Sequence, residues 1–397
     1  MTPLALAWRT TVRYRARAIL AIVGVAVIGA LLFDMLLLSR GLLVSFARLL
    51  NAEGFDVRIV ATQGLTRLPI PDSAALAQAV RAVPGVADVV AIRAESADVR
   101  TDRGSRRVTL VGRSGTNANP WRLVRGPGLT DAASPAACEA VVDRAFPSAF
   151  GADVGAQIQV TALPSGQSAL PAIGCRIVGI ADFGFSASGE HTVATTMAAL
   201  QRAMGDTREG DAEVILVSTA AGAEREAIVR AIGRLRPDVR AYSNADVVEQ
   251  FDRNGFAYFR QISVVLSTLT TAFAFLLVAT LLTVSINQRL GEIAVLRALG
   301  IARQRIARML FWESALLVGV GALAALPLGG VLAVGLDRLL RQMPGLPEGL
   351  HFFVFEPRAL VVHLAVFGVT AAASAAYPIW LAARLPIAET LRREIVG

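Results

Sequence analysis

The sequence contains no lysine, because all 39 of its basic residues are arginine. The phosphate-binding loop of P-loop ATPases depends on a lysine that reaches the nucleotide phosphates. This sequence therefore holds no such ATPase site. Any ATP-driven activity would require a separate nucleotide-binding chain.

Charged residues are also scarce. They make up 18% of the sequence against 54% hydrophobic residues, whereas about a quarter of a soluble protein is charged. A helix that crosses a bilayer needs about 20 apolar residues, and the chain offers four such stretches: Ile19–Leu38, Ile262–Ile286, Ser314–Leu336 and Ala359–Leu381. A mostly polar stretch of roughly 200 residues separates the first two. The composition predicts a membrane protein with four spans and one large water-facing domain.

Cysteine and histidine are too few to build a metal site. His191, His351 and His363 are scattered, and no CxxC or HExxH motif occurs. The two cysteines, Cys138 and Cys175, both fall in the water-facing domain. Outside the cytoplasm a disulfide persists, and it would contribute about 3–4 kcal/mol by closing the loop. Two buried free thiols are the alternative. No spacing of serine, histidine and aspartate indicates a catalytic triad, so we expect no enzyme activity and no bound cofactor.

The arginines orient the four spans. Residues 1–18, 287–310 and 382–397 together hold twelve arginines against three acidic residues. Arginine in short loops marks the cytoplasmic side of a membrane. We therefore expect both termini in the cytoplasm and the large domain outside. Nucleic-acid binding, the other meaning of a high positive charge, is disfavoured because the surplus flanks the spans.

The first span carries one acidic residue, Asp34, near its outer end. An ionisable residue inside a membrane is a functional candidate by default. The alternative is a carboxylate that snorkels to the interface or packs between helices. Before this span, residues 3–17 place apolar side chains on one face and arginines elsewhere, which predicts an interfacial helix on the inner leaflet. The span is too long for a signal peptide and lacks a cleavage site.

The large domain shows a repeated pattern. Strand–helix–strand signals occur at about 55–93 and again at 213–243, and two such units commonly fold together as one α+β domain. The first helix should begin at Asp72 or Ser73. The second should turn Ile228, Ile232 and Leu235 inward. Residues 131–205 are rich in strand signals, contain both cysteines, and are predicted to form an inserted lobe.

A basic segment separates the second and third spans. Leu290, Ile293, Leu296, Arg297 and Gly300 recur at helical spacing. We predict one helix from about 246 to 299, roughly 80 Å long, which ends at Gly300. These arginines are either topology signals on a solvated face or part of a surface for a partner. The density of the pattern favours a partner.

Three stretches of this sequence resemble one family. "GEIAVLRALGIARQRIARMLFWESALL" (291–317) resembles the signature of the FtsX/MacB-like permeases of ABC transporters, the mechanotransmission or type VII class. "LALAWRTTVRYRARAILAIVGVAVIGALL" (4–32) is similar to their first segment, and "YPIWLAARLPIAETLRRE" (377–394) to their usual ending. The resemblance covers essentially the whole chain, and it is specific to the family rather than to a substrate.

The resemblance implies a partner for the basic segment. In this family the segment docks on a separate ABC ATPase, present in two copies, which binds ATP and Mg. The permease forms a dimer with a second copy or a homologous permease. The implied coupling interface comprises Glu292, Arg297, Leu299, Gly300, Arg303 and Arg305. The stroke would pass along the second helix to the external domain and drive export, efflux or extraction of a substrate such as a lipoprotein, lipid, peptide or drug. A periplasmic adaptor protein is a further expected partner.

Two other functions stay open. An FtsX-like regulator would transmit the ATPase motion to an extracytoplasmic cell-wall hydrolase without transport, although such proteins tend to have smaller external domains. A receptor would need no ATPase at all.

The four predicted spans divide the chain as follows: 1–46 interfacial helix and first span, 47–255 extracytoplasmic domain (porter-like split lobe 50–130 and 206–250, inserted β-rich lobe 131–205), 256–287 second span, 288–310 coupling segment, 311–336 third span, 337–358 outer loop, 359–382 fourth span and 383–397 cytoplasmic tail.

Overall fold

The computed structural model divides the chain into two compact units, which are described separately. The helical unit comprises Met1–Leu42, Phe256–Leu340 and His351–Gly397, and the sheet unit comprises Leu43–Gly255 and Arg341–Leu350. The structure describes residues 15–62, 69–115, 119–130, 137–163, 170–205, 211–255, 257–287, 291, 295, 299–343, 346–347 and 349–384.

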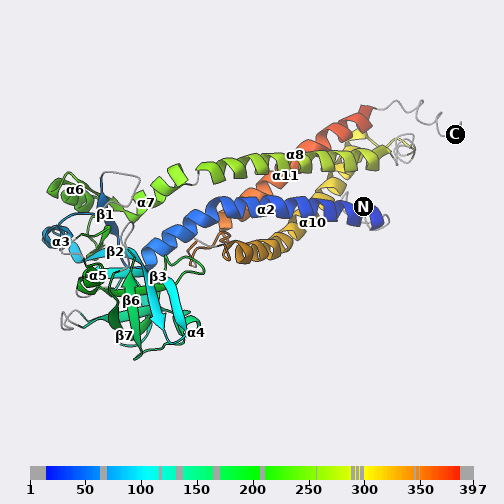
Figure 1. Ribbon diagram of the computed structural model, residues 1–397. Coiled ribbons are helices and arrows are strands. Elements are labelled where there is room, and N and C mark those ends of the chain that lie inside the picture. Colours follow the sequence, from blue (N-terminus) through cyan, green and yellow to red (C-terminus); the bar gives the residue numbers. More distant parts are fainter. Residues whose placement is uncertain are drawn as a thin grey trace. The chain divides into compact units, whose positions relative to one another are not determined.

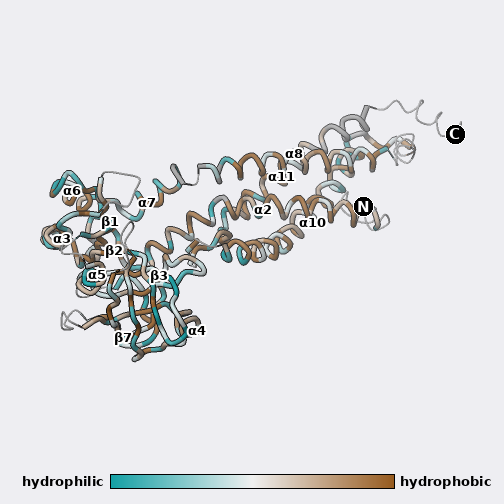
Figure 2. The backbone as a smooth tube through the Cα atoms, in the orientation of Figure 1, coloured by the Kyte–Doolittle hydropathy of each residue, from teal (hydrophilic) through white to brown (hydrophobic). Residues whose placement is uncertain are grey.

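Long apolar helices make up the helical unit (Figures 1 and 2). They are α2 (Arg15–Ala52, whose last turns enter the sheet unit), α8 (Ala257–Asn287), α10 (Arg303–Leu340) and α11 (Pro357–Arg384). Three segments are long and apolar enough to cross a membrane: Ala18–Ala52, Gln261–Leu281 and Gln304–Leu340. The fourth predicted span is represented by the shorter apolar segment Pro357–Ala373.

Small residues let α2 and α10 approach closely. A Cβ added to Gly29 would lie 2.7 Å from that of Ala325, and one added to Gly321 would lie 2.6 Å from Val25. Such small-residue contacts are typical of helix packing in membranes, where van der Waals contact drives association. The core between the helices is formed by Val25, Leu32, Val278, Val318, Ala322 and Phe367.

The long helix predicted from 246 to 299 is corrected by the structure. Helix α7 (Asn244–Gln250) begins with a capping box between Ser243 and Asp246. It then passes into a π-helical turn, η1 (Phe251–Gly255), before α8 begins at Ala257. A π-turn inserts an extra residue into the helical ladder. The interruption falls at Gly255, the strongest helix breaker in this stretch.

The sheet unit contains one ten-stranded mixed sheet. Its strands are β1 (Val57–Ala61), β2 (Val86–Thr101), β3 (Gly104–Ser114), β4 (Arg122–Arg125), β5 (Glu139–Asp143), β6 (Gln157–Ala162), β7 (Ile173–Asp182), β8 (Thr192–Thr196), β9 (Val214–Thr219) and β10 (Val239–Ser243). Its helices besides α7 and the end of α2 are α3 (Ser73–Arg81), α4 (Phe146–Phe150), α5 (Met197–Ala203) and α6 (Arg225–Leu235).

Both predicted strand–helix–strand units are present. They interleave in the order β10-β1-β9-β2, with every neighbouring pair antiparallel. Val57 and Ile59 are fully buried against α3 and α6, whereas Arg58 between them points to the other face, as the period of two requires. Helix α3 begins after Asp72, as expected. Leu235 is exposed rather than inward, because α6 ends at that residue.

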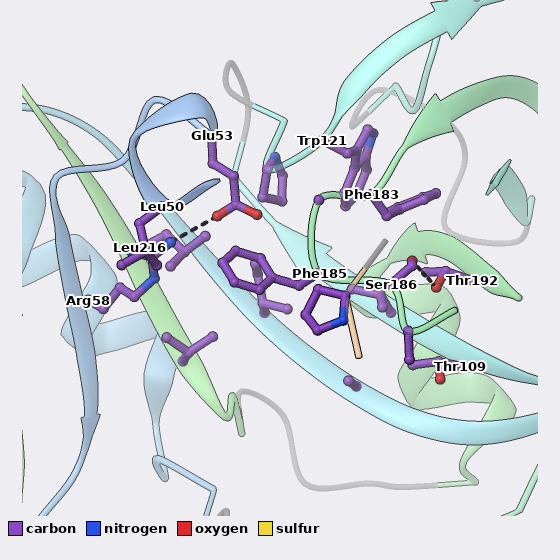
Figure 3. Close-up of a pocket in the computed structure, with 18 of the residues that line it drawn as sticks. Leu50, Glu53, Arg58, Thr109, Trp121, Phe183, Phe185, Ser186, Thr192 and Leu216 are labelled. Carbon is purple, nitrogen blue, oxygen red and sulfur yellow. Dashed lines mark hydrogen bonds and ion pairs between the residues drawn. The ribbon is translucent and has the colours of Figure 1, made fainter. Parts of the chain in front are cut away.

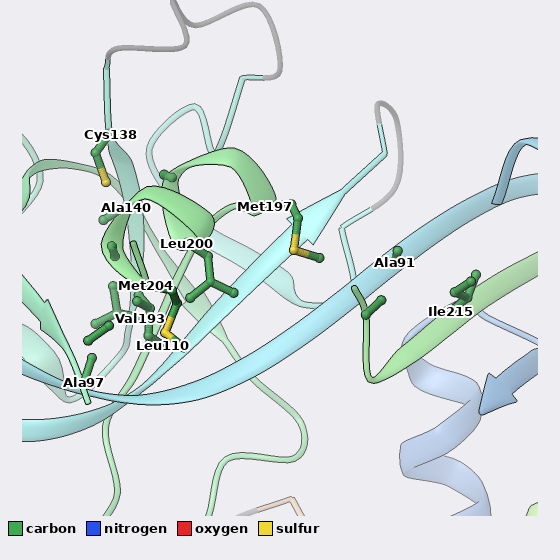
Figure 4. Close-up of a cluster of buried hydrophobic side chains, with 14 of the residues drawn as sticks. Ala91, Ala97, Leu110, Cys138, Ala140, Val193, Met197, Leu200, Met204 and Ile215 are labelled. Atoms are coloured by element: carbon green, nitrogen blue, oxygen red, sulfur yellow. The ribbon is translucent and has the colours of Figure 1, made fainter. Parts of the chain in front are cut away.

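The remaining strands close into a ring. Pairing runs from β2 through β3, β8, β5, β7 and β6 and returns to β2. Helix α5 covers the inside of this ring with Met197, Leu200 and Met204 (Figure 4). Leu200 lies so close to Gly112 of β3 that a Cβ there would be 2.6 Å from its Cδ2.

Strand β2 belongs to both parts of the sheet. Its residues Val86–Ile92 pair with β9, and Ala97–Arg100 pair with β6. The strand pairing therefore changes partners inside β2, rather than at the boundary of 131 that the sequence predicted. The reason is long-range pairing, which local periodicity does not report.

The segment after α10 packs on the sheet unit. Ser188 donates its backbone N–H to the Leu346 carbonyl at 2.8 Å, and Ala187 forms a β-bridge with Pro347. Residues of this 341–350 segment thus belong to the same compact unit as the ten-stranded sheet.

Candidate functional site

The face of the sheet opposite α3 and α6 forms the floor of a cavity. Helices α3 and α6 cover the face on which Ile59, Ile215 and Val217 lie. Residues of alternate parity face the other way, and the cavity of about 710 Å³ is lined there by Arg58, Ile92, Ala94, Thr109, Val111, Val214 and Leu216. The period of two along each strand thus gives one face to the core and the other to the cavity.

Aromatic side chains form much of the cavity wall. Trp121 and Phe183 pack with ring centroids 5.2 Å apart. Phe185 follows Phe183 on the segment after β7, and its ring lies 6.4 Å from that of Phe46 near the end of α2. Figure 3 shows the rings of Trp121, Phe183 and Phe185 beside the space into which Glu53 points. Aromatic walls of this kind are usual in small-molecule sites.

One ion pair lies in this otherwise largely apolar wall. Glu53 follows the last turn of α2, and Arg58 lies on β1. The Nη2 of Arg58 donates to Glu53 Oε2 at 2.9 Å, while its Nη1 donates to Asn244 Oδ1. Both side chains are nearly enclosed, with 12% and 13% of their surface exposed. None of the described residues donates a hydrogen bond to the other carboxylate oxygen, Oε1.

Burial outweighs pairing for both members of this ion pair. Desolvation raises the pKa of Glu53 to about 7, although Arg58 acts to lower it. Desolvation likewise lowers the pKa of Arg58, although Glu53 acts to raise it. A buried ion pair whose desolvation exceeds its attraction costs the fold stability. The pair is therefore not explained by the stability of the sheet unit.

A second cavity, of about 700 Å³, is bordered by several charged side chains and lies around Asp182 and His191. Burial acts to raise the pKa of Asp182, but hydrogen bonds from Arg122 and Arg144 prevail and lower it. His191 Nδ1 lies 3.1 Å from Asp143 Oδ2, which also accepts from the Thr192 backbone N–H at 2.9 Å. Since Asp143 also orders the backbone, we assign this pair a structural role.

The predicted coupling residues are only partly described. Glu292 and Arg297 lie outside the described residues, and only the backbone of Arg303 is described. Leu299 donates its N–H to the Val295 carbonyl at 3.0 Å, a helical bond, and its side chain is 75% exposed. Gly300 follows with φ of +85°, the left-handed conformation that ends helices. Arg305 is exposed in the first turn of α10.

The ionisable residues of the helical unit are enclosed by protein. Asp34 is 1% exposed, and neither of its carboxylate oxygens has a hydrogen-bond partner among the described residues. This burial disfavours the snorkelling alternative. His363 is fully buried between Phe33 and Phe367, and its Nε2 lies 3.4 Å from the Ala322 carbonyl. His351 instead contacts Asp337 at 3.1 Å.

The structure pairs the two cysteines. Cys138, just before β5, and Cys175 on β7 have Sγ atoms 2.00 Å apart, a disulfide that joins positions 37 residues apart. Among the described residues, no cluster of histidine, cysteine, aspartate and glutamate is arranged to hold a metal ion.

Sequence reasoning missed the cavity and its ion pair. Glu53 and Arg58 are close in sequence but separated by the end of α2, so no single periodicity links them. Phe183 and Phe185 come from more than a hundred residues away. The only local signals were an acid directly after an apolar helix and the aromatic pair in "DFGFS" after a strand.

Comparisons with known proteins agree with this architecture. The model of the FtsX-like permease C-terminal family matches residues 264–387, and the model of the MacB-like periplasmic core domain matches residues 18–235. An uncharacterised ABC transporter permease protein of Mycobacterium tuberculosis is 29% identical over 195 residues. These residues cover 47% of this chain and 22% of that relative, so the chain spans about a fifth of the relative's length.

Two solved structures are similar to about half of the chain. The periplasmic region of MacB from Actinobacillus actinomycetemcomitans is 13% identical, with a TM-score of 0.40, over 51% of this chain and 96% of that one. The extracellular domain of the noncanonic ABC-type transporter YknZ from Gram-positive bacteria is 13% identical, with a TM-score of 0.34, over 47% and 98%.

The two family models define the class first: the chain is a membrane protein of the ABC transporter permease type, with a MacB-like periplasmic core domain. Since one family model spans more than half of the chain, the family follows. The chain belongs to the FtsX/MacB-like permeases, as the sequence motifs indicated.

Proposed function

We propose that this chain is the permease subunit of an ABC transporter that couples ATP hydrolysis by a separate ATPase to export or extraction of a substrate at the outer side of the bacterial cytoplasmic membrane. The observation that carries the proposal is the helix end at Leu299–Gly300, within the family's permease region. Leu299 is 75% exposed there, and Arg305 in the first turn of α10 is exposed as well, so an apolar and a charged side chain near this helix end are available to a partner protein.

The topology supports the same assignment. The 341–350 segment after α10 packs on the unit formed by residues 43–255. Both must therefore lie on one side of a membrane. With alternating spans, the basic segment 288–310 and both termini fall on the opposite side, which the arginine surplus identifies as cytoplasmic.

The expected mechanism is mechanical. The ATPase would bind at Glu292, Arg297, Leu299, Gly300, Arg303 and Arg305, and its closure would move α8. The π-turn η1 then lies on the path from α8 to the sheet unit, because it directly precedes that helix in the chain. A dimer of permeases with two ATPases, and a periplasmic adaptor, complete the proposed assembly.

Affinity purification of the tagged full chain in mild detergent tests the ATPase partner. A soluble ABC ATPase should copurify with the wild type and be lost from Arg297→Glu and Gly300→Trp. Arg230→Glu is the matched control, because Arg230 is exposed on α6 of the sheet unit. Absence of an ATPase from the wild type, or its full retention by both interface variants, contradicts the proposal.

The other co-purified proteins separate the two functions that the family allows. A periplasmic adaptor or an exported substrate supports transport. A cell-wall hydrolase that copurifies in its place supports the FtsX-like regulatory role.

A further inference from the structure

The net charge of the cavity on the sheet favours a cationic ligand. Its charged lining residues are Glu53, Arg58 and Glu190. With all three ionised, the cavity carries one net negative charge. Glu190 is exposed at the rim, whereas Glu53 and Arg58 are nearly enclosed in the wall.

The ion pair leaves one acceptor free. Arg58 uses two of its N–H donors on Glu53 Oε2 and Asn244 Oδ1. Glu53 Oε1 accepts no hydrogen bond from the described residues, and Figure 3 shows the carboxylate pointing into the cavity. An incoming cation therefore meets a carboxylate oxygen, whereas an incoming anion is repelled by the same carboxylate when it is ionised.

The rest of the wall favours flat apolar groups. The rings of Phe46, Trp121, Phe183 and Phe185 border the cavity, and Ile92, Val214 and Leu216 form part of its floor. The face of an aromatic ring attracts cations, and the Arg58 guanidinium already lies 5.9 Å from the centre of the Phe185 ring. Aromatic walls with one net negative charge suit a molecule that is apolar over most of its surface and carries one positive charge.

The cavity also touches every chain segment that leads into the helical unit. Phe46 and Leu50 belong to α2, Val247 belongs to α7, which precedes η1 and α8, and Pro347 belongs to the segment between α10 and α11. Phe46 stacks on Phe251 of η1 with centroids 4.1 Å apart. A ligand in the cavity would contact each of these segments directly.

From these observations we infer that the cavity is a binding site for an amphipathic organic monocation, held by Glu53 through its free oxygen and by the surrounding aromatic rings. The cavity by itself accounts for binding of the cation to the permease without the ATPase. An effect of the bound cation on ATP hydrolysis rests in addition on the proposed function, because it requires the separate ATPase.

The cost of the ion pair supports this inference. Glu53 and Arg58 are buried at the expense of stability, since desolvation dominates the pKa of both groups. Functional sites commonly retain groups that the fold alone would not favour. A cation beside Glu53 would supply the second positive partner that the buried carboxylate lacks.

Titration of the purified full chain with ethidium tests the site. Ethidium is a flat aromatic monocation with amino donors, and its fluorescence rises in apolar surroundings. The aromatic anion 1-anilinonaphthalene-8-sulfonate is the opposite-charge probe. We expect saturable ethidium binding that weakens at least tenfold in Glu53→Gln and is unchanged in Glu226→Gln, which alters an exposed acid on α6. The anion should show no dependence on Glu53.

A second variant keeps the test decisive if Glu53→Gln folds poorly. Ala94→Phe fills the cavity floor without changing any charge, and it should abolish ethidium binding while the chain elutes as the wild type in gel filtration. Lowering the pH from 8 to 6 should weaken ethidium binding about tenfold, because Glu53 titrates at about 7. Arg58 stays charged in this range, and Glu190 is the only other acid on the described lining.

The inference is overturned if ethidium binds Glu53→Gln and Ala94→Phe as it binds the wild type, or if the anion binds in an Arg58-dependent manner. Because the ATPase is absent from this measurement, failure of ethidium binding leaves the proposed coupling untouched. Failure of ATPase copurification equally leaves the cation site standing.

Discussion

The sheet unit and the helical unit use similar apolar residues in opposite ways. In the sheet unit Val57, Ile59, Ile215 and Val217 are fully buried. In the helical unit α8 leaves Val264, Val265 and Phe273 more than half exposed, and only 17% of its apolar window is buried. This difference indicates that the two units fold in different surroundings. The sheet unit buries its apolar residues from water, whereas the helices present them to a bilayer or to further helices.

The largest effects are expected when the same charge is placed in both units, which tests whether their surroundings differ. Val217→Asp puts an unpaired carboxylate in the core between β1 and β2, where Val217 is fully buried. Such a charge costs about 3–5 kcal/mol, and we expect the sheet unit to become protease-sensitive. Phe273→Asp, on an exposed side of α8 near the middle of the span, should instead reduce membrane insertion, since aspartate costs about 3 kcal/mol at a span centre. Normal insertion of Phe273→Asp would show that α8 does not face lipid.

Loss of the disulfide is expected to destabilise the sheet unit and to leave the helical unit unchanged. Removing the bond between Cys138 and Cys175 in a double serine variant should lower the unfolding free energy of the sheet unit by about 3–4 kcal/mol, because the closed loop of 37 residues regains its entropy when unfolded. Thermal melting followed by limited proteolysis measures the change. The helical unit should retain its digestion pattern. An equal loss in both units would mean that they unfold together.

The stability of the sheet unit should depend on pH through Glu53. The pKa of Glu53 is raised from 4.5 to about 7 in the folded chain. Its protonated form is therefore favoured by folding, and the wild type should lose stability relative to Glu53→Gln as the pH rises from about 4.5 through 7. The expected loss is up to about 3 kcal/mol, and melting of both proteins across this range measures it. If the wild type instead lost stability relative to Glu53→Gln as the pH fell, the prediction would be contradicted.

Two aspartates give the smallest predicted effects, with opposite signs in one unit. Asp34 has no partner among the described residues, so Asp34→Leu should raise the melting temperature by removing a buried polar group, worth about 1–3 kcal/mol. Asp337 accepts the backbone N–H of Phe352 at 2.8 Å and contacts His351. Asp337→Ala should lower the melting temperature by a similar amount. Destabilisation by Asp34→Leu would indicate a partner for this carboxylate in the assembled transporter.

Much of the local structure could be predicted from the sequence. Alternation in "GFDVRIVA" indicated β1, and the "TDRGS" turn joins β2 to β3 with Thr101 opposite Gly104. The glycine that ends the helix at 300 was recognised from residue type alone. Each of these depends on neighbours a few residues apart, which a sequence displays directly.

Long-range features could not be read in the same way. The ring closes because β6 pairs with β2, more than fifty residues earlier in the chain, and strand order of this kind leaves no local pattern. The cavity likewise combines α2, the strands and the segment after β7. The π-turn at Phe251–Gly255 begins at Phe251, which stacks on Phe46 of α2, and a contact across this distance in the chain leaves no local pattern either.

The most direct test of the central claim is site-specific photo-crosslinking at Leu299 in intact membranes. A photoreactive phenylalanine replaces this exposed side chain at the helix end, and the same group at Leu235, exposed on the sheet unit, serves as the control. We predict that position 299 yields a crosslinked product containing an ABC ATPase and that position 235 does not. If position 299 yields no such product, or if both positions yield it equally, the basic segment is not the site through which an ATPase drives this permease.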